Sequence, residues 1–337
     1  MALRLVHTQD VQSYWTATTE GDVEAAYAVF CAVLDRGVPL GDVLDRLIAA
    51  SQARVGDLWA CNRWTVLQEH HATSVNERVL DRLSARRTGV ARGPRVLLTC
   101  VEQEWHTMAT TLLAVKLRVA GVRVDYRLGE VDAAELAHRI SRTRPRAVLL
   151  SASLVSSLGA AASLVELVRD LRTPVMVGGS AFDREGLRAR RIGATAYAAT
   201  ADEALPVLID LPVRTDSLPD LVPPEVREAE RIRACSADLS SLVLDDLCAR
   251  LDLSLVADLP PEDWRGVLVT SVPYVVDSVA GALLTRDPSV LTQMQTWLDE
   301  VLQARDADPR SSVELWSSLQ RQLLHQPHAT ALLADLV

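Results

Sequence analysis

Between residues 95 and 200, short apolar runs rich in β-branched residues alternate with segments of helical periodicity. Strands that alternate with helices form a parallel sheet, because each parallel connection needs a crossover and the crossover is usually a helix. We therefore predict a Rossmann-like, doubly wound sheet with helices on both faces, whose ligands lie beyond the carboxyl ends of the strands. The strand-like runs are residues 95–101, 121–129, 144–153, 173–179 and 194–200.

The regions on either side of this alternation have helical spacing of apolar residues throughout. Residues 8–88 predict about four helices with short connections, which is typical of an antiparallel bundle. Residues 211–224 contain four prolines and predict a linker, after which the pattern is helical again. We predict three domains, namely a helical bundle at 1–90, the sheet domain at 91–211, and a linker with an all-α domain at 212–337.

The composition argues against several classes of function. The chain has 44 acidic and 35 basic residues and a formal net charge of −9, which is unfavourable for a constitutive grip on nucleic acid. No apolar run reaches the ~18 residues of a membrane span, and the start MALRLVH has no long apolar stretch of a signal peptide. The five cysteines fit neither a disulfide framework nor a close metal knuckle. We expect a cytoplasmic protein without membrane contact.

The loop after the first predicted strand carries a histidine beside a carboxylate. Glu104 and His106 are two positions apart in the segment CVEQEWHTMA. A neighbouring carboxylate orients a metal-ligating imidazole and makes it more basic, although an exposed loop histidine near an acid has the same pattern. The third strand ends in Ser151-Ala152-Ser153 and the fourth in Gly178-Gly179-Ser180. We expect all three features on one edge of the sheet.

In this order the three features resemble the cobalamin-binding fold, whose pattern is Asp-x-His-x-x-Gly, then Ser-x-Leu, then Gly-Gly. Glu104 takes the place of the Asp, Ala109 of the Gly and Ser153 of the Leu. The resemblance implies that His106 is the metal ligand beneath cobalt and that Glu104 is hydrogen-bonded to its other ring nitrogen. It also implies that further residues contact the cofactor: Thr107, Ser151, Ser153, Gly178, Gly179 and Ser180.

The predicted bundle contains a second motif, Trp59-x9-Glu69-His70. With Val66 these residues fall on one helical side if the helix continues or resumes quickly, and they could equally be core residues and a solvated edge. Ahead of a cobalamin domain the motif resembles the signature of B12-dependent photoreceptors. The resemblance implies that Trp59, Val66, Glu69 and His70 surround the adenosyl group of adenosylcobalamin, and that light breaks the cobalt–carbon bond and shifts the bundle.

The sequence departs from the DNA-binding members of that group in two ways. Those members carry a histidine directly after the Trp, which captures cobalt after photolysis, whereas this chain has Ala60. His70 and His71 are the nearest candidates for a second imidazole. Those members also have a winged helix-turn-helix before the bundle, whereas here the bundle starts at once. We therefore expect no direct contact with DNA.

The third domain contains no nucleotide loop or catalytic motif. The order of bundle, cobalamin domain and helical domain resembles the photocobilins, which implies biliverdin as a probable second chromophore in the third domain. Cys235 or Cys248 could form a thioether with it, although a buried helix cysteine is the better interpretation. The candidates for its propionates are Arg265, Arg286, Arg305 and Arg321, and those for its pyrrole nitrogens are Tyr274, His325 and His328.

Together these features predict a light sensor and not an enzyme. We expect a homodimer that binds adenosylcobalamin and biliverdin and signals by changed domain packing or oligomeric state to an effector that the sequence does not identify. A corrinoid protein for methyl transfer would share residues 95–210, and a B12-dependent interaction protein without light chemistry is a third interpretation. Trp59 argues against methyl transfer, because a bulky cap would obstruct the methyl-transfer partner.

Overall fold

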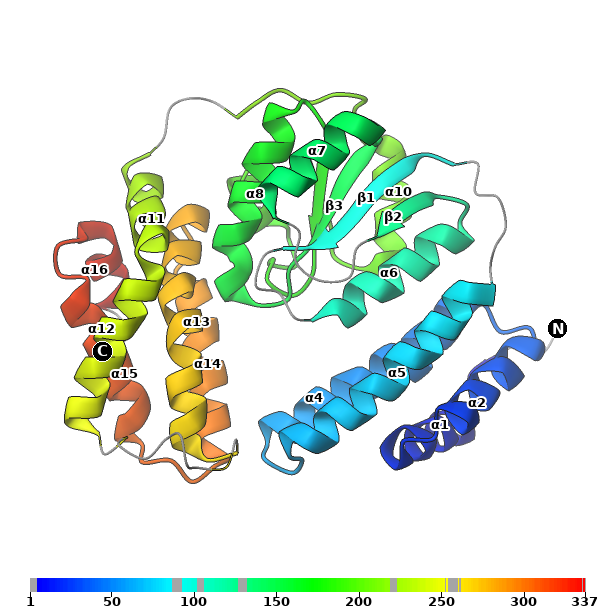
Figure 1. Cartoon of the computed structure of the whole chain (residues 1–337), viewed down its shortest axis with the longest axis horizontal. Helices are drawn as coiled ribbons and strands as arrows, with labels where there is room; N and C mark the ends of the chain where they lie inside the picture. The colour runs from blue at the N-terminus through cyan, green and yellow to red at the C-terminus, as the bar shows by residue number, and fades with distance from the viewer. Residues whose placement is uncertain are drawn as a thin grey trace. The chain divides into compact units, whose positions relative to one another are not determined.

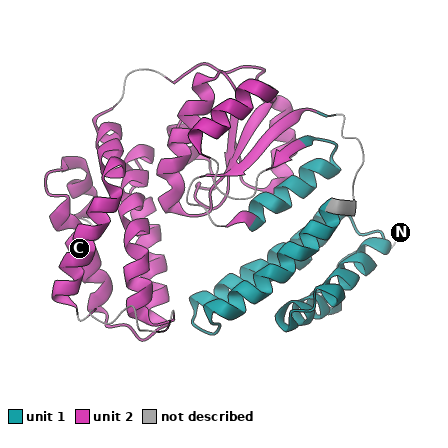
Figure 2. Ribbon diagram, in the orientation of Figure 1, with its two compact units in different colours: residues 1–93, 108–123 teal, residues 94–107, 124–337 magenta. Residues whose placement is uncertain are grey.

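The structure is a computed structural model that describes residues 5–86, 93–101, 106–126, 132–218, 223–251, 253, 260, 262–334 and 336. The chain divides into two compact units, drawn in teal and magenta in Figure 2. Unit 1 consists of residues 1–93 and 108–123, and unit 2 of residues 94–107 and 124–337.

Unit 1 is a helical bundle (Figure 1). A π-helical turn, η1, joins α3 and α4 into one continuous helix, so four helices precede α6. Met108, Leu112 and Val115 of α6 pack into the same core as the bundle residues Phe30 and Leu80. This apolar face of α6 was not anticipated as part of the bundle. The bounds are α1 (Thr8–Glu20), α2 (Val23–Asp35), α3 (Leu40–Val43), η1 (Leu44–Ala49), α4 (Ala50–Ala60), α5 (Val66–Arg86) and α6 (Thr107–Val119).

Unit 2 contains a five-stranded sheet in the order β2-β1-β3-β4-β5, and β1, β3, β4 and β5 pair in parallel. β1 and β3 are almost wholly buried, as expected for parallel strands with helices on both faces. The predicted Rossmann-like, doubly wound sheet is confirmed. The bounds are β1 (Arg95–Cys100), β2 (Arg123–Tyr126), α7 (Ala133–Thr143), β3 (Ala147–Ser151), η2 (Val155–Ser157), α8 (Leu158–Asp170), β4 (Val175–Gly178), α9 (Leu187–Arg191), β5 (Ala196–Ala198) and α10 (Ala201–Asp210).

The rest of unit 2 is helical, and its central helix is α13. That helix has 22 residues and a mean hydropathy of 1.7 in its most apolar window, so by length and composition it could span a membrane, contrary to the expectation from sequence. However, 72% of that window is buried inside the protein, as in the core helix of a globular domain. The bounds are α11 (Pro224–Ala234), α12 (Ser236–Arg250), α13 (Trp264–Thr285), α14 (Ser289–Gln303), α15 (Arg310–Gln322) and α16 (Pro327–Leu333).

The C-terminal helices pack directly on the sheet domain. α13 contacts η2, α8 and α9. A Cβ atom on Gly281 of α13 would lie 3.1 Å from the carbonyl oxygen of Val155 and 3.2 Å from the Cβ of Leu158, so glycine permits this close approach. Arg191 of α9 donates a hydrogen bond to the carbonyl of Thr285 at the end of α13. The helical region is therefore part of one compact body with the sheet, and not a domain on a free hinge.

Candidate functional site

The residues predicted for the sheet edge lie at the carboxyl ends of neighbouring strands. Cys100 of β1 is opposite Ser151 of β3, and Ser151 is opposite Gly178 of β4. His106 follows β1 and directly precedes α6, and its side chain is exposed. An exposed imidazole at this edge can reach a metal that lies outside the protein surface, and imidazole is the commonest metal-ligating side chain. The residues present therefore fit a cobalt-containing cofactor.

Two parts of the predicted loop differ in what the structure describes. Glu104 lies outside the described residues, so its hydrogen bond to His106 stays a prediction. Thr107, the first residue of α6, is described, and its carbonyl accepts a hydrogen bond from the Tyr126 hydroxyl at 3.5 Å. This long contact ties the start of α6 to the end of β2.

The two glycines at the end of β4, Gly178 within the strand and Gly179 directly after it, are required by the fold itself. A Cβ atom on Gly178 would lie 2.7 Å from the carbonyl oxygen of Ala198, and one on Gly179 would lie 2.2 Å from that of Ala152. Gly179 also has φ +109, a conformation that side chains disfavour. Ser180 donates to the carbonyl of Ser153 at 2.7 Å. This hydrogen bond links the segments that follow β3 and β4.

The cap motif of unit 1 comes from two helices. Trp59 lies in the last turn of α4, the chain turns through Asn62 (φ +56), and α5 begins at Val66. The expectation that these residues share one helical side is therefore wrong. Trp64 in the turn stacks on Trp15 of α1 with ring centroids 5.5 Å apart, which holds the turn against the bundle.

Glu69 and His70 form a pair at the start of α5. Nδ1 of His70 lies 2.8 Å from the Val66 carbonyl and 2.8 Å from Oε2 of Glu69. Because both neighbours are oxygen acceptors, Nδ1 carries the proton, and Nε2 keeps a lone pair for a ligand or metal. The His70 side chain is 72% exposed, so this nitrogen is accessible.

The two candidates for a second imidazole are separated by the structure. A Cβ atom on Gly21 would lie 2.0 Å from Nε2 of His71, so the His71 ring lies against the turn between α1 and α2. His70 is instead held by Glu69. We therefore retain His70 as the candidate.

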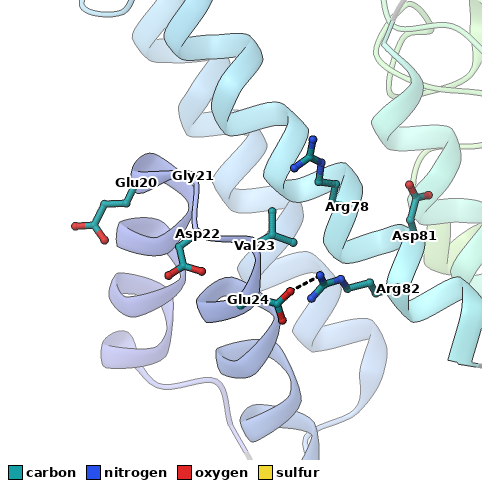
Figure 3. A pocket seen from close by; sticks show the side chains of 8 residues that line it. All are labelled: Glu20, Gly21, Asp22, Val23, Glu24, Arg78, Asp81 and Arg82. Atoms are coloured by element: carbon teal, nitrogen blue, oxygen red, sulfur yellow. Dashed lines mark hydrogen bonds and ion pairs between the residues drawn. The ribbon is translucent and has the colours of Figure 1, made fainter.

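A groove of about 740 Å³ lies beside the same turn (Figure 3). Its charged side chains include Glu24 and Arg82, which form an ion pair. The hydrogen bond from Arg82 holds the pKa of Glu24 below its usual value, although slight desolvation opposes it. This pair satisfies its own charges, and none of the predicted cofactor residues lines the groove.

A second cavity, of about 510 Å³, lies inside unit 2 between the η2–α8 segment and helices α11, α12 and α13. Its volume is in the range of about 300–1,000 Å³ that is typical of small-molecule sites. Small side chains make room on one side and polar ones converge from the other. The lining residues are Ser156, Ser157, Gly159, Ala160, Arg233, Ala234, Ser236, Ala237, Ser240, Pro273, Tyr274 and Asp277.

The polar groups of this cavity are incompletely paired. Asp277 accepts a hydrogen bond from Ser236 at 2.7 Å but has no ion-pair partner among the residues that the structure describes. Burial raises the pKa of Asp277, although Ser236 and Arg233 oppose the shift. Ser240 is 7% exposed, and its hydroxyl has no hydrogen-bond partner in the described part of the chain. Such groups favour a ligand that can complete their hydrogen bonds.

Arg233 supplies the positive charge of the cavity. Its guanidinium crosses Gly159, where a Cβ atom would lie 2.7 Å from the arginine Cδ, and it donates to Ser163 at 2.6 Å. The cavity thus combines a guanidinium with the Asp277 carboxylate and the Tyr274 ring. A molecule that carries both N–H donors and carboxylates would match this combination.

The sequence analysis missed Arg233 and Asp277. A usable signal was present, because Asp277 is the single acidic residue within the apolar helix α13. Of the residues proposed from sequence for the second chromophore, Tyr274 lines the cavity. The interpretation of Cys235 and Cys248 as buried is wrong, because both are exposed.

The other candidates from sequence are engaged elsewhere or lie outside the cavity lining. Arg265 pairs with Asp263, Arg321 pairs with Asp246, Arg305 donates to the Val301 carbonyl, and Arg286 caps α13. His325 is exposed, and the backbone N–H of His328 donates to Glu228.

Comparison with protein families identifies the cofactor class. Residues 94–209 match a family model described as a B12 binding domain, and residues 11–84 match a second model with the same description. The first match contains the strand-end residues and the second contains the cap motif. The chain is therefore a cobalamin-binding protein.

Solved structures of similar proteins include three corrinoid proteins or complexes. The monomethylamine corrinoid protein of Methanosarcina barkeri has 20% identity and a TM-score of 0.48 over 59% of this chain and 96% of its own. The methanol:cobalamin methyltransferase complex of the same organism has 15% identity and a TM-score of 0.32, over 63% and 83%. A cobalamin-binding protein of Desulfitobacterium hafniense has 18% identity and a TM-score of 0.31, over 59% and 97%. No curated protein matches the sequence.

Proposed function

We propose that this protein is a light sensor that binds adenosylcobalamin. The observation that carries the proposal is an accessible imidazole in each of the two segments with B12-binding similarity. His106 is exposed at the strand ends of unit 2, and His70 is exposed in unit 1, where Glu69 orients it. In this proposal His106 would ligate the cobalt, and the cap residues Trp59, Val66, Glu69 and His70 would contact the adenosyl group.

When bound, adenosylcobalamin supplies a cobalt–carbon bond that light can break. His106 would hold the cofactor through its imidazole, Trp59 and Val66 would provide apolar surface for the adenosyl group, and the Glu69–His70 pair would offer polar contacts. Nε2 of His70 would be the candidate for a second imidazole.

We further propose that biliverdin is a second chromophore, in the 510 Å³ cavity of unit 2. The support is chemical. The Asp277 carboxylate can accept hydrogen bonds from pyrrole N–H groups, Arg233 can pair with a propionate, and Ser240 has an unused hydroxyl. Charge-assisted hydrogen bonds of this kind are about twice as strong as neutral ones.

The output in this proposal is a change of shape or assembly, and the protein has no catalytic role. A ligand shifts an equilibrium between two conformations only by its differential affinity for them. Loss of the adenosyl group removes a set of contacts from the cap and so changes that balance. We propose a cytoplasmic homodimer whose dark and lit states differ in domain packing or oligomeric state.

The test is an absorption spectrum of the full-length protein loaded with adenosylcobalamin and biliverdin, before and after green light. The expected result is an irreversible loss of the adenosylcobalamin spectrum together with a separate red band from the bilin. Light scattering in the dark and after illumination reports the assembly. A protein that binds methylcobalamin in preference and shows no light-dependent change would overturn the sensor and favour a methyl-transfer role.

A further inference from the structure

A chain of polar side chains crosses the core of unit 1. The Tyr14 hydroxyl donates to Oδ1 of Asn76 at 3.0 Å, and Nδ2 of Asn76 donates to Oε1 of Gln52 at 3.0 Å. Nε2 of Gln52 donates to the Thr73 hydroxyl at 2.8 Å, and this hydroxyl donates to Oε1 of Glu69 at 2.9 Å. This series of hydrogen bonds connects α1, α5 and α4 and ends at Glu69 of the cap motif.

Filling a helical core with this series of polar side chains costs more free energy than filling it with apolar ones. Tyr14 is 1% exposed and Asn76 is 0% exposed, and buried polar groups cost free energy unless they are hydrogen-bonded. Apolar residues of similar size would pack the same space without that cost, as they do at Phe30 and Leu80 nearby. A polar chain that is fully paired along its length therefore indicates a role beyond packing.

All four hydrogen bonds of the chain are donated in one direction, towards Glu69. Burial raises the pKa of Tyr14, so its hydroxyl keeps its proton and remains a donor. Hydrogen bonds aligned in this way polarise one another. The carboxylate of Glu69 is the natural end of such a chain, because it can only accept.

Glu69, the last member of this hydrogen-bonded series, fixes the orientation of the exposed His70. Oε1 of Glu69 is held by Thr73, and Oε2 faces Nδ1 of His70 at 2.8 Å. Both carboxylate oxygens are therefore occupied, and the imidazole is oriented although its side chain is 72% exposed. An exposed side chain ordinarily samples several rotamers, so this restraint places Nε2 in one direction.

We infer that Tyr14, Gln52, Thr73 and Asn76 are positioning residues for the Glu69–His70 pair, and that they set how strongly the cap discriminates between upper ligands of cobalamin. The inference rests on the proposed function, in which this pair faces the upper ligand. Thr73 bonds to Glu69, and Gln52, Asn76 and Tyr14 follow in series behind Thr73, so all four act through Glu69.

The test compares three variants of the full-length protein. Thr73→Val removes the hydroxyl and keeps the shape, and Thr73→Ser restores the hydroxyl. Ser74→Ala is the control, because the Ser74 hydroxyl donates to the His71 carbonyl on the same helix and not to a member of this series. Titrations with adenosylcobalamin and methylcobalamin give the preference between the two. We expect Thr73→Val to lower this preference about tenfold, as for a lost hydrogen bond to a charged group, while the other two variants keep it.

A second measurement does not depend on the cofactor. The Cε1–H resonance of His70, recorded at fixed pH in the cobalamin-free protein, should move in Thr73→Val and stay in Thr73→Ser. Tyr14→Phe removes the first donor and should move the resonance in the same direction. This variant replaces Thr73→Val if the latter folds poorly. Unchanged ligand preference and an unmoved His70 line in the valine variant would overturn the inference and leave the sensor intact. A wild-type protein without preference for adenosylcobalamin would instead overturn the proposed function.

Discussion

Nε of Arg188 lies 2.7 Å from a carboxylate oxygen of Asp287, although the two residues are 99 positions apart in the chain. Arg188 is only 4% exposed. Its other nitrogens donate to the Ala181 carbonyl and to the side chains of Ser289 and Gln293. The hydrogen bonds from Ser289 and Arg188 lower the pKa of Asp287 against the effect of desolvation. This cluster fastens α9 of the sheet domain to the start of α14.

Replacing Arg188 by Ala should therefore destabilise unit 2 strongly. Removal of one partner leaves the Asp287 carboxylate partly buried without its cation, which costs about 3–5 kcal/mol of unfolding free energy. Urea denaturation measures the change. Arg190→Ala is the matched control, because the exposed Arg190 side chain donates to the Glu185 carbonyl and is not part of this cluster. This variant should change stability by less than ~0.5 kcal/mol. Equal midpoints for the two variants would show that the cluster is not needed.

His106→Ala should abolish the spectrum of imidazole-ligated cobalamin and weaken cobalamin binding sharply, because the variant lacks the proposed cobalt ligand. His138→Ala, an exposed histidine on α7, should leave both unchanged. Glu104→Gln should weaken binding by about 10–100-fold, as for other partners of metal ligands. Titration by absorbance gives both quantities, and a His106 variant with the wild-type spectrum would contradict the assignment.

Trp59→Ala should lose the preference for adenosylcobalamin over methylcobalamin while the corrin still binds. In the proposed function the indole would provide apolar surface for the adenosyl group, which methylcobalamin lacks. Trp64→Ala tests the same hairpin without touching the motif, and should cost stability through the lost stack on Trp15 without a change in preference. If Trp59→Ala discriminates between the two cobalamins as the wild type does, Trp59 is not part of the cap.

Arg233→Gln and Asp277→Asn should each weaken biliverdin binding about tenfold, because each removes a charge-assisted hydrogen bond. The red absorbance during a biliverdin titration measures this affinity. Arg231→Gln is the control, since Arg231 bonds to Gln326 and lies outside the cavity lining. Point variants are preferable to truncation near Leu211, because truncation would expose the faces of η2 and α8 that α13 covers. Wild-type affinity in both cavity variants would place the bilin elsewhere.

Asp277 should make the ligand-free protein less stable as the pH rises. Its pKa in the folded state is raised by burial, so folding favours the protonated form. The associated stability is complete below the unfolded pKa of about 4 and is lost as the pH rises through the folded value. Asp277→Asn should remove this dependence and be more stable than the wild type at pH 7. Denaturation curves of the wild type and of Asp277→Asn at pH 4 and pH 7 test the sign of this dependence. The prediction is contradicted if the wild type gains stability relative to the variant as the pH rises from 4 to 7.

The sheet was predictable because its signals are local. Each of β1 and β3 contains a run of five buried apolar or small residues, preceded in β1 by the exposed Arg95. Their connections leave few alternative topologies. α10 was missed, since Pro206 lies inside it. Its start was nevertheless marked by Thr200, which accepts from the N–H of Glu203, while the Glu203 carboxylate accepts from Ala199.

The residues at the strand edge could be predicted from sequence, whereas those of the cavity could not, for a physical reason. Ser151 and Gly178 could be placed together from sequence, because parallel strands end at the same edge. Arg233, Asp277 and Gly159 come from three helices whose packing no local pattern encodes. The α4–α5 turn was likewise hidden, since the spacing of Trp59 and Glu69 does not reveal where a helix ends.

The short stretch from Ser151 to Ser157 belongs to both places where unit 2 can hold a ligand. Ser151 stands at the strand edge, whereas Ser156 and Ser157 line the cavity and neighbouring Val155 touches Gly281. Two occupants that each change the conformation of this piece of backbone would be thermodynamically linked. If a cofactor at the strand edge changes the affinity of the cavity for its ligand by some factor, the ligand in the cavity changes the affinity of the strand edge for the cofactor by the same factor. Each cofactor in such a protein would therefore report on the other's concentration as well as on light.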